Sequence, residues 1–526
     1  MANLPFLSSA FGFAFAAFGG ERKTKSRETS CERVAANLVH LPGKPAGVQS
    51  GAVQLLASRS SLRSDKRYLI EEFLMNAFHR RHLIKVGGMG LLGLSMPKIL
   101  RAAERPAAIK ARAKSVIFLF QWGGPSQLDT FDMKPSAPNT IRSPFQSIAT
   151  SAPGIQICDQ LPEMAKHMDK VCLIRTLTHT MKNHASAGYY AITGHAPPSD
   201  DQRLRDSLDL FPGYGSVVDH LMPNTNGMPT FVAYPHVIRD GSIVPGQHAS
   251  FLGKAHDPLL FLEDPNSPSF KLPELSLPAG LSFERLQRRR EVQRLVDRQA
   301  KLLEFSAEAR GLDQYYDKAI SMLTSDRVRQ AFDLTSESPG IRDRYGRTTY
   351  GQGCLLARRL VEAGVKFVTV YFSDSIGGRE VGRGGWDTHG FDNSRMYKIV
   401  DKYQLPMTDQ TLPTLLDDLD DRGLLEETLV VWMGEFGRTP KINQNESRDH
   451  WPQCYTALLA GGGVKGGYVY GKSDANAMFP DEHPVKPEDL AATLFHLLGI
   501  DPSAEIRDRN DRPLVIGGRS LTEIMV

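Results

Sequence analysis

The chain has 526 residues, of which 41% are hydrophobic and 23% charged, and these proportions exclude a mainly disordered, collagen-like or coiled-coil protein. Residues 1–104 hold 15 of the 63 basic and 7 of the 59 acidic side chains, which leaves 48 basic and 52 acidic side chains from residue 105 onward. Because this larger part is slightly acidic, it has no net positive field, and we expect no nucleic-acid partner. The five cysteines include no CxxC pair, so a zinc ribbon is unsupported.

Residues 75–104 combine paired arginines with a short apolar stretch. Arg80 and Arg81 precede about 11 weakly hydrophobic, glycine-rich residues, and Ala102 and Ala103 follow. This layout is typical of a bacterial twin-arginine export signal. The apolar stretch is shorter than the roughly 20 residues that a membrane-spanning helix needs. We therefore expect no transmembrane helix, and export to the periplasm or outside the cell. The alternative is a buried glycine-rich helix.

The residues before this segment show little periodicity. Met75 lies five residues before Arg80, which is where the start of an export signal belongs. We therefore interpret residues 1–74 as a disordered extension or the product of a misplaced start. A genuine N-terminal extension is the alternative.

From residue 114 onward, short apolar runs alternate with helical patterns. The apolar runs predict strands buried on both faces of a sheet, at 115–120, 171–174, 231–234, 366–372, 428–433 and 455–460. Helices are predicted at 184–193, 208–222, 283–309, 314–333, 350–363, 393–420 and 487–498. This alternation predicts one α/β domain over 105–526, a largely parallel sheet with helices on both faces. The charged stretch 281–335 is interpreted as a helical insertion.

Polar clusters follow four of the predicted strands. They occupy 121–132, 175–184, 385–389 and 434–440, the last with 448–451 nearby. Ligands of open α/β sheets bind beyond the carboxyl ends of the strands, so four such clusters together predict an active site.

The residue types in these clusters favour a metal. Asp387 and His389 can face one ion from a single turn, and Glu435, Asp449 and His450 can complete a nitrogen and oxygen ligand set. Such a set suits a divalent zinc, manganese or iron ion, whereas calcium prefers oxygen alone. The structural alternatives are a hydrogen-bonded turn at 387–389, a salt-bridged surface turn at 449–450 and a Glu435–Arg438 ion pair.

Four strings carry a resemblance to a known family. They are Gly-Gly-Pro-Ser-Gln-Leu-Asp-Thr-Phe-Asp at 123–132, Asn-His-Ala-Ser-Ala-Gly-Tyr-Tyr-Ala-Ile-Thr-Gly at 183–194, Gly-Trp-Asp-Thr-His at 385–389 and Gly-Glu-Phe-Gly-Arg-Thr-Pro at 434–440. The chain resembles the bacterial domain of unknown function 1501 family, whose members are exported and frequent in planctomycetes. That family is similar to the alkaline phosphatase and sulfatase superfamily. The resemblance implies a three-layer α/β/α sandwich with a metal-dependent hydrolase site.

The superfamily motifs map onto this chain with departures. Sulfatases carry Cys-x-Pro-Ser-Arg, and counting back from the Thr-Gly pair at 193–194 places His184 at the nucleophile position, with Ser186 two residues on. The modified cysteine is absent and Gly188 stands in place of the arginine, which argues against a sulfatase with a modified-cysteine nucleophile and leaves a phosphatase-type serine or threonine open. Asp129 and Asp132 are possible counterparts of the superfamily's metal carboxylates, and Glu435 keeps a carboxylate where a histidine is lost.

Two functions follow from these residues. The first is an exported metal-dependent hydrolase of phosphate or sulfate esters, acting on a small anionic ester or a sulfated polysaccharide. Ser186 or His184 would attack, and Arg438 would pair with the anionic group. The second is a non-catalytic binding or structural protein on a degenerate sulfatase-like fold. The oligomeric state and a Cys158–Cys172 pairing stay open.

Overall fold

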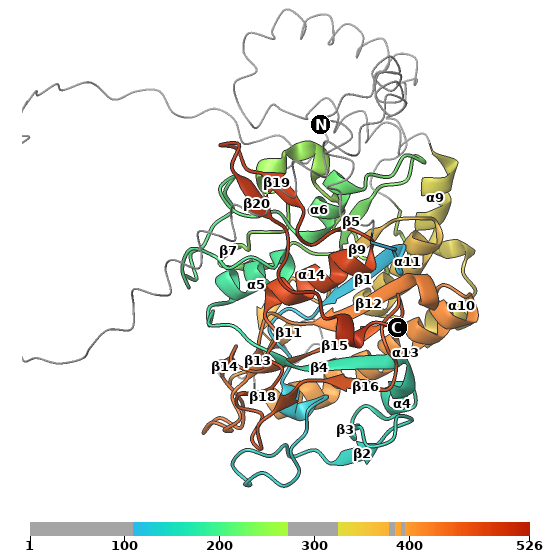
Figure 1. The fold of residues 1–526 in the computed structure, drawn as a ribbon. Coiled ribbons are helices and arrows are strands. Elements are labelled where there is room, and N and C mark those ends of the chain that lie inside the picture. Colours follow the sequence, from blue (N-terminus) through green and yellow to red (C-terminus); the bar gives the residue numbers. More distant parts are fainter. Residues whose placement is uncertain (1–108, 272–324, 378–383, 391–394) are drawn as a thin grey trace, which may run out of the picture. The chain divides into compact units, whose positions relative to one another are not determined.

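The computed structural model describes residues 109–271, 325–377, 384–390 and 395–526 (Figure 1). The predicted extension over 1–74, the predicted export signal over 75–104 and most of the predicted insertion over 281–335 lie outside the described residues.

The centre of the described chain is an eight-stranded sheet (Figure 1). Its strands run in the order β16 (Tyr468–Tyr470), β4 (Val171–Leu177), β15 (Tyr455–Ala460), β12 (Thr428–Met433), β1 (Ser115–Phe120), β9 (Phe367–Tyr371), β5 (Phe231–Tyr234) and β8 (Leu259–Leu260). Strand β15 is antiparallel to both of its neighbours, and every other neighbouring pair is parallel. The predicted, largely parallel sheet is therefore confirmed.

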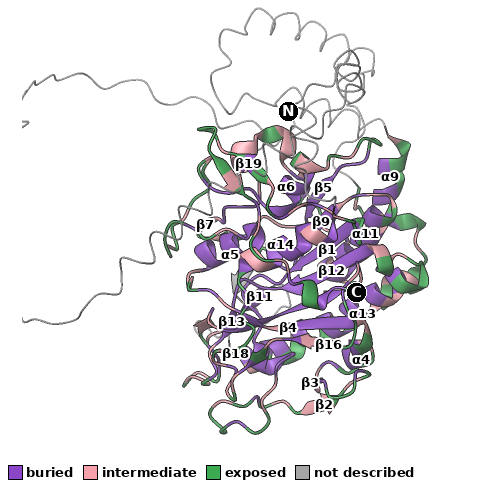
Figure 2. Ribbon diagram, in the orientation of Figure 1, coloured by how far each residue is buried: buried purple, intermediate pink, exposed green. Residues whose placement is uncertain are grey.

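Strand β1 shows why the central strands are continuously apolar. All six of its residues are buried. Ile117 and Leu119 pack into the core on one face of the sheet, whereas Val116, Phe118 and Phe120 pack into the core on the other face. A strand covered on both faces has no side open to water, so it needs no alternation of polar and apolar residues (Figure 2).

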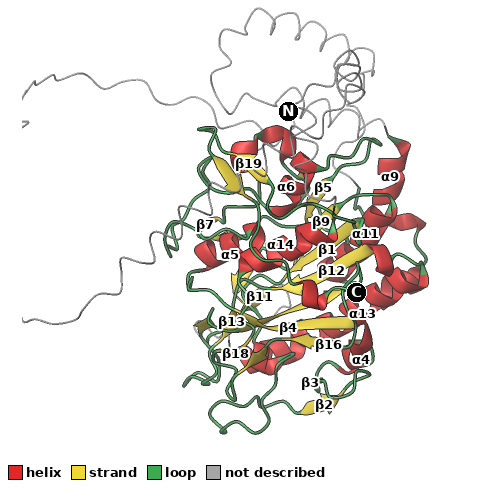
Figure 3. Ribbon diagram, in the orientation of Figure 1, coloured by secondary structure: helices red, strands yellow, loops and turns green. Residues whose placement is uncertain are grey.

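Helices cover both faces of the sheet (Figure 3). One core contains side chains of α5 (His184–Thr193), α6 (Tyr214–Leu221) and α14 (Pro487–Leu497). The other contains side chains of α4 (Pro162–Ala165), α9 (Asp326–Phe332), α11 (Thr349–Glu362), α12 (Met396–Ile399) and α13 (Leu405–Asp421), with α10 (Pro339–Arg344) packed against α13. This is the expected three-layer α/β/α arrangement.

Within the described residues, six pairs of short strands lie outside the main sheet. They are β2 (Ser147–Ala149) with β3 (Gln156–Cys158), β6 (Arg239–Asp240) with β7 (Ser242–Ile243), β10 (Ser375–Gly377) with β11 (Gly384–Asp387), β13 (Gly437–Arg438) with β14 (His450–Trp451), β17 (Lys472–Ser473) with β18 (Pro480–Glu482), and β19 (Glu505–Arg507) with β20 (Pro513–Val515). The β11 and β13–β14 strands carry residues of the functional site.

Predicted and observed helices differ where turn residues or a π-helix intervene. The helix predicted over 208–222 begins only at Tyr214, after Pro212 and Gly213. The helix predicted over 393–420 is divided into α12 and α13 by a π-helix, Val400–Gln404. Of the helix predicted over 314–333, the described part is α9, and the helix predicted over 283–309 lies outside the described residues.

None of the described helices is long and apolar enough to cross a membrane. The four cysteines in the described residues are free and buried, so Cys158 and Cys172 are not paired. Burial raises the pKa of the Cys172 thiol to about 12, which keeps it protonated.

The packing predicts that two leucine-to-alanine substitutions will differ clearly in their effect on the free energy of unfolding. Leu416 on α13 is fully buried, whereas Leu262 is 59% exposed. Leu416→Ala removes core contacts and leaves a cavity, so we expect the free energy of unfolding to fall by about 2–5 kcal/mol. Leu262→Ala is the matched control and should change it by less than about 0.5 kcal/mol. Urea denaturation of both variants measures the difference, and equal losses would contradict the assigned packing.

Candidate metal centre

Chain segments that follow β1, β4 and β12 meet the end of β11 at one edge of the sheet. The Trp386 amide on β11 donates to the Trp122 carbonyl just after β1, at 2.8 Å, and so fixes β11 against that segment. Strand β13 pairs with β14 so that Arg438 lies opposite His450. Helix α5 begins at His184, a few residues after β4. The carboxyl ends of the strands therefore gather the polar clusters, as expected.

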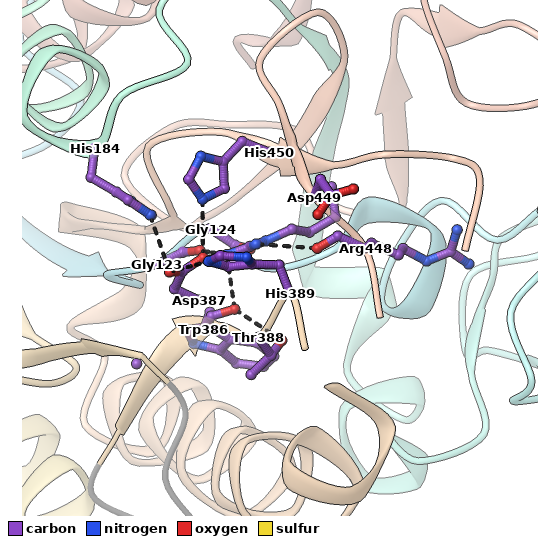
Figure 4. Close-up of polar contacts among 12 residues, drawn as sticks. Gly123, Gly124, His184, Trp386, Asp387, Thr388, His389, Arg448, Asp449 and His450 are labelled. Carbon is purple, nitrogen blue, oxygen red and sulfur yellow. Dashed lines mark hydrogen bonds and ion pairs between the residues drawn. The ribbon is translucent and has the colours of Figure 1, made fainter. Parts of the chain in front are cut away.

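The Asp387 carboxylate is the centre of this cluster (Figure 4). Its Oδ1 lies 3.0 Å from His450 Nε2 and 2.8 Å from an Arg438 guanidinium nitrogen. Its Oδ2 lies 3.1 Å from His389 Nε2 and 3.4 Å from His184 Nε2. Asp387 is only 8% exposed, so the three histidines and the arginine replace most of its contact with water.

Arg438 is fully buried, and its guanidinium contacts protein groups in place of water. Besides Asp387, its guanidinium donates to the backbone carbonyls of Gly123, Gly124, Trp386 and Arg448. Burial alone would raise the pKa of the Asp387 carboxyl, but the charges of Arg438 and His184 hold it well below its usual range. Asp387 is therefore an ionised carboxylate.

His184 and Glu435 form a second buried pair beside Asp387. His184 Nδ1 lies 2.6 Å from Glu435 Oε1, and the Gly123 amide donates to the same carboxylate at 2.9 Å. His184 Nε2 is buried and makes no hydrogen bond. Burial disfavours a charged imidazole, but Asp387 and Glu435 together overcome this and raise the pKa of His184 to about 9.

His450 has its tautomer set by a backbone group. Its Nδ1 lies 2.9 Å from the Lys182 carbonyl, which can only accept, so Nδ1 carries the proton. Burial lowers the pKa of His450 to about 4, and the hydrogen bond that a protonated Nε2 would donate to Asp387 offsets this only in part. At neutral pH the Nε2 lone pair of a neutral imidazole therefore faces the ionised Asp387 at 3.0 Å with no proton between them.

The donor atoms fit a small divalent cation. One ligand atom each from His184, Asp387 and His450 lies within 4.8 Å of the other two. Tetrahedral zinc with ligands at about 2.1 Å separates two ligand atoms by roughly 3.4 Å. The separations of 3.0 Å from His450 Nε2 to Asp387 Oδ1 and of 3.4 Å from His184 Nε2 to Asp387 Oδ2 are close to that value. Both imidazoles also have Nδ1 held by an acceptor, the arrangement that directs Nε2 at a metal.

The family follows from a comparison with known sequences. The family described as "Protein of unknown function (DUF1501)" matches residues 113–525. The chain belongs to this family. The family predicted from the four motifs is thereby confirmed. No curated protein matches the sequence.

Solved structures with a similar arrangement are distant in sequence. One is a protein in the alkaline phosphatase superfamily from Vibrio parahaemolyticus, with 12% identity, a TM-score of 0.38 and coverage of 80% of this chain and 72% of that one. Another is the PsFucS1 sulfatase from Pseudoalteromonas sp., with 12% identity, a TM-score of 0.37 and coverage of 79% and 72%. A third is the lipoteichoic acid synthase LtaP from Listeria monocytogenes, with 10% identity, a TM-score of 0.34 and coverage of 79% and 77%.

Of the seven predicted metal-site residues of this DUF1501 protein, the structure brings four together, Asp387, His389, Glu435 and His450, and leaves three apart. His184, predicted at the nucleophile position, lies with these four. Glu435 contacts His184 and the Gly123 amide rather than Asp387, so it supports a ligand. His389 lies on the more open side, with 23% of its side chain exposed, and is not one of the three converging ligands.

Asp449, Asp129 and Asp132 have other partners. Asp449 is exposed and accepts from Asn443 at 3.2 Å. The buried Asp129 forms an ion pair with Arg448, at 2.7 Å. The buried Asp132 contacts Ser473, and Lys134 at 3.0 Å and Arg175 at 3.5 Å. Asp129 and Asp132 thus serve to fix loops, because their carboxylates are already neutralised by cations.

Ser186 and Arg438, both predicted for catalytic roles, are buried and have partners within the protein. Ser186 is fully buried, and its hydroxyl donates to the Asp201 carbonyl at 2.9 Å and accepts from the Asp201 amide at 2.7 Å. It ties the helix to a loop and does not face the cluster as a nucleophile would. Arg438, equally buried, uses its guanidinium on Asp387 and on backbone carbonyls, so it has no free face for an anionic substrate.

Three further groups of the site could not be predicted from the residue types in the sequence. The Gly123 amide and the Lys182 carbonyl act through the backbone, which every residue type offers. Gln127 holds Arg438 by both its amide atoms, accepting from the Arg438 amide at 2.9 Å and donating to the Arg438 carbonyl at 2.9 Å. Such a contact, across about 310 residues, is decided by the fold.

The buried arginine allows a stability test. Arg438→Gln leaves Asp387 without its cation, so we expect the free energy of unfolding to fall by about 3–5 kcal/mol, as when one partner of a buried ion pair is removed. Arg344→Gln is the control, because Arg344 is half exposed and lies 3.6 Å from Asp417. Its loss should cost about 1 kcal/mol or less. Urea denaturation of both variants checks this, and an Arg438→Gln protein as stable as the control would contradict the charge assignment.

Proposed function

We propose that this protein is an exported, metal-dependent hydrolase of phosphate or sulfate esters. The observation that carries the proposal is the convergence of His184, Asp387 and His450, with both imidazole Nδ1 atoms already committed to acceptors. A divalent cation among these three ligand atoms would replace the proton on His184 and would relieve the repulsion between the Asp387 carboxylate and the Nε2 lone pair of the neutral His450. The nitrogen and oxygen set favours zinc, manganese or iron.

Each residue has a defined task in this proposal. His184 Nε2, His450 Nε2 and Asp387 would hold the ion, with His389 beside them on the more open side. Glu435 orients His184, in the manner of a carboxylate–histidine–metal triad. A bound divalent ion polarises an ester oxygen and lowers the pKa of a water molecule.

The attacking group is proposed to be water. Ser186, the serine candidate from the sequence, is buried and hydrogen-bonded to the backbone of Asp201. A direct attack by water needs only an open coordination position, and the partly exposed rings of His389 and His450 leave that side accessible.

An anionic substrate also agrees with the charges. The two carboxylates Asp387 and Glu435 are balanced by Arg438 and a divalent ion, which leaves a net positive centre. The ester group would therefore approach along His389 and His450. The substrate classes are a small phosphate or sulfate ester or a sulfated polysaccharide, and the predicted signal at 75–104 would carry the enzyme through the twin-arginine pathway.

Metal content tests the site directly. We expect about one zinc, manganese or iron ion per chain when the full chain is purified without chelator and measured by elemental analysis. Asp387→Asn and His450→Gln should lower this at least tenfold, because each removes one of three ligands. The matched control is Asp449→Asn, one residue before His450 but exposed and paired with Asn443, which should keep the metal. A wild-type protein purified without bound metal would contradict the proposed mechanism.

Activity tests the role of water. With p-nitrophenyl phosphate and p-nitrophenyl sulfate as substrates, we expect the metal-loaded protein to hydrolyse at least one. Ser186→Ala should keep kcat within about tenfold of the wild type, since the serine only supports a loop, whereas Asp387→Asn should lose at least about 100-fold. A Ser186→Ala variant as inactive as Asp387→Asn would instead restore serine as the nucleophile.

A binding protein on the same fold is the second candidate. The buried state of Arg438 and Ser186 favours it, because neither an arginine for the anion nor a side-chain nucleophile faces the cluster. A protein that holds the metal and binds sulfated polysaccharide, but hydrolyses neither test ester, would support this candidate over the hydrolase.

A further inference from the structure

His179 lies behind the metal centre and contacts none of the three converging ligand side chains. It follows β4, in the loop that leads to His184 at the start of α5. It is 7% exposed, and the rings of Tyr190 and Tyr455 flank it, each with its centroid 5.4 Å away. The histidine is thus fixed on two sides by aromatic packing, and its polar atoms are directed at the backbone.

The two ring nitrogens of His179 have opposite and well-defined roles. Nε2 lies 2.7 Å from the Glu435 carbonyl oxygen, which can only accept, so Nε2 donates. Nδ1 lies 3.1 Å from the Met181 amide, which can only donate, so Nδ1 accepts. The neutral ring with its proton on Nε2 satisfies both partners. Burial lowers the pKa of His179 to about 4, so the ring keeps this form at neutral pH.

The backbone of His179 makes a third connection. Its amide donates to the Pro452 carbonyl at 2.9 Å, directly after the strand that carries His450. One residue thereby joins the segment before His184, the peptide of Glu435 and the segment after His450. The His184–Glu435 contact of 2.6 Å depends on the first two segments keeping their spacing.

We infer that His179 is a positioning residue of the metal centre, which sets the distance between Glu435 and His184 and so the orientation of the His184 ligand. This inference rests on the proposed metal site. It assigns His179 no contact with the metal or the substrate. If His179 only filled space, its substitution by a residue that keeps the packing would leave the metal affinity unchanged.

Three variants of the full chain separate the hydrogen bond from the packing. His179→Leu removes both polar contacts and keeps an apolar side chain. His179→Gln places an amide donor where Nε2 lies, so it can still reach the Glu435 carbonyl. His179→Asn has the same amide on a side chain shorter by one carbon, which can accept from Met181 but does not reach Glu435. The matched control is His195→Leu, since His195 stacks on Phe211 and burial also lowers its pKa to about 4.

The readout is metal affinity, measured with Zn²⁺ by competition with a chelator, and the visible absorption spectrum of the Co²⁺-loaded protein. We expect His179→Leu and His179→Asn to weaken Zn²⁺ binding by about 10-fold or more and to change the Co²⁺ spectrum, as the loss of an outer-shell partner does. His179→Gln should stay within about threefold of the wild type, and His195→Leu should bind Zn²⁺ as the wild type does, whatever its stability.

The outcomes separate the two proposals. A wild-type protein that binds Zn²⁺ while His179→Asn binds equally well would overturn the positioning role and leave the proposed function in place. Equal weakening in His179→Gln, His179→Asn and His195→Leu would also overturn it, since a general loss of stability explains that result. If His179→Leu does not fold, the Asn and Gln pair decides. A wild-type protein without affinity for Zn²⁺ or Co²⁺ would overturn both proposals.

Discussion

Asp387 carries a negative charge in a place where water hardly reaches it, and Arg438 makes that possible. A buried carboxylate without a cation would take up a proton, because its charged form loses hydration. The Arg438 guanidinium, 2.8 Å away, prevents this. The same guanidinium donates to four backbone carbonyls from the segments around β1, β11 and β14. One buried cation therefore sets both the charge of Asp387 and the position of the segments around β1, β11 and β14, the last of which carries His450.

This crowded arrangement explains two glycines in the loops that follow β1 and β12. Gly124 has a positive φ of 76°, and a Cβ there would lie 2.7 Å from the Phe436 ring and carbonyl oxygen. At Gly434 a Cβ would lie 2.6 Å from Pro125. The two loops can approach closely enough for the Gly123 amide to reach Glu435 only because these side chains are missing. These two glycines are thus a packing requirement of the site.

The chemistry available at the site differs from the chemistry that the superfamily resemblance implies. A histidine stands where a nucleophile was expected, and its two nitrogens are directed at Glu435 and Asp387. The serine nearest to it in the sequence and the motif arginine both face inward. What remains open to solvent is the side lined by His389 and His450. This arrangement agrees with the proposed hydrolysis by a bound ion and water, without a covalent intermediate on the protein.

The sequence by itself determined six of the eight strands of the main sheet and the longer helices between them, because a strand buried on both faces must be continuously apolar and a helix on one face must be periodic. It also determined that the polar clusters would meet, since the parallel strands place their carboxyl ends at one edge. It did not show the two short edge strands β8 and β16. Only the tertiary structure decided which members of each cluster face one another. Asp129 and Asp387 are both acids in motif loops, but Asp129 meets Arg448 whereas Asp387 meets three histidines and Arg438. Ser186 and His184 are two residues apart on one helix, and a rotation of about 200° between them turns one toward a loop and the other toward the site. Residues that are close in the sequence belong to the same motif, but their hydrogen-bond and ion-pair partners come from distant segments. Gln127 and Arg438, for example, are about 310 residues apart.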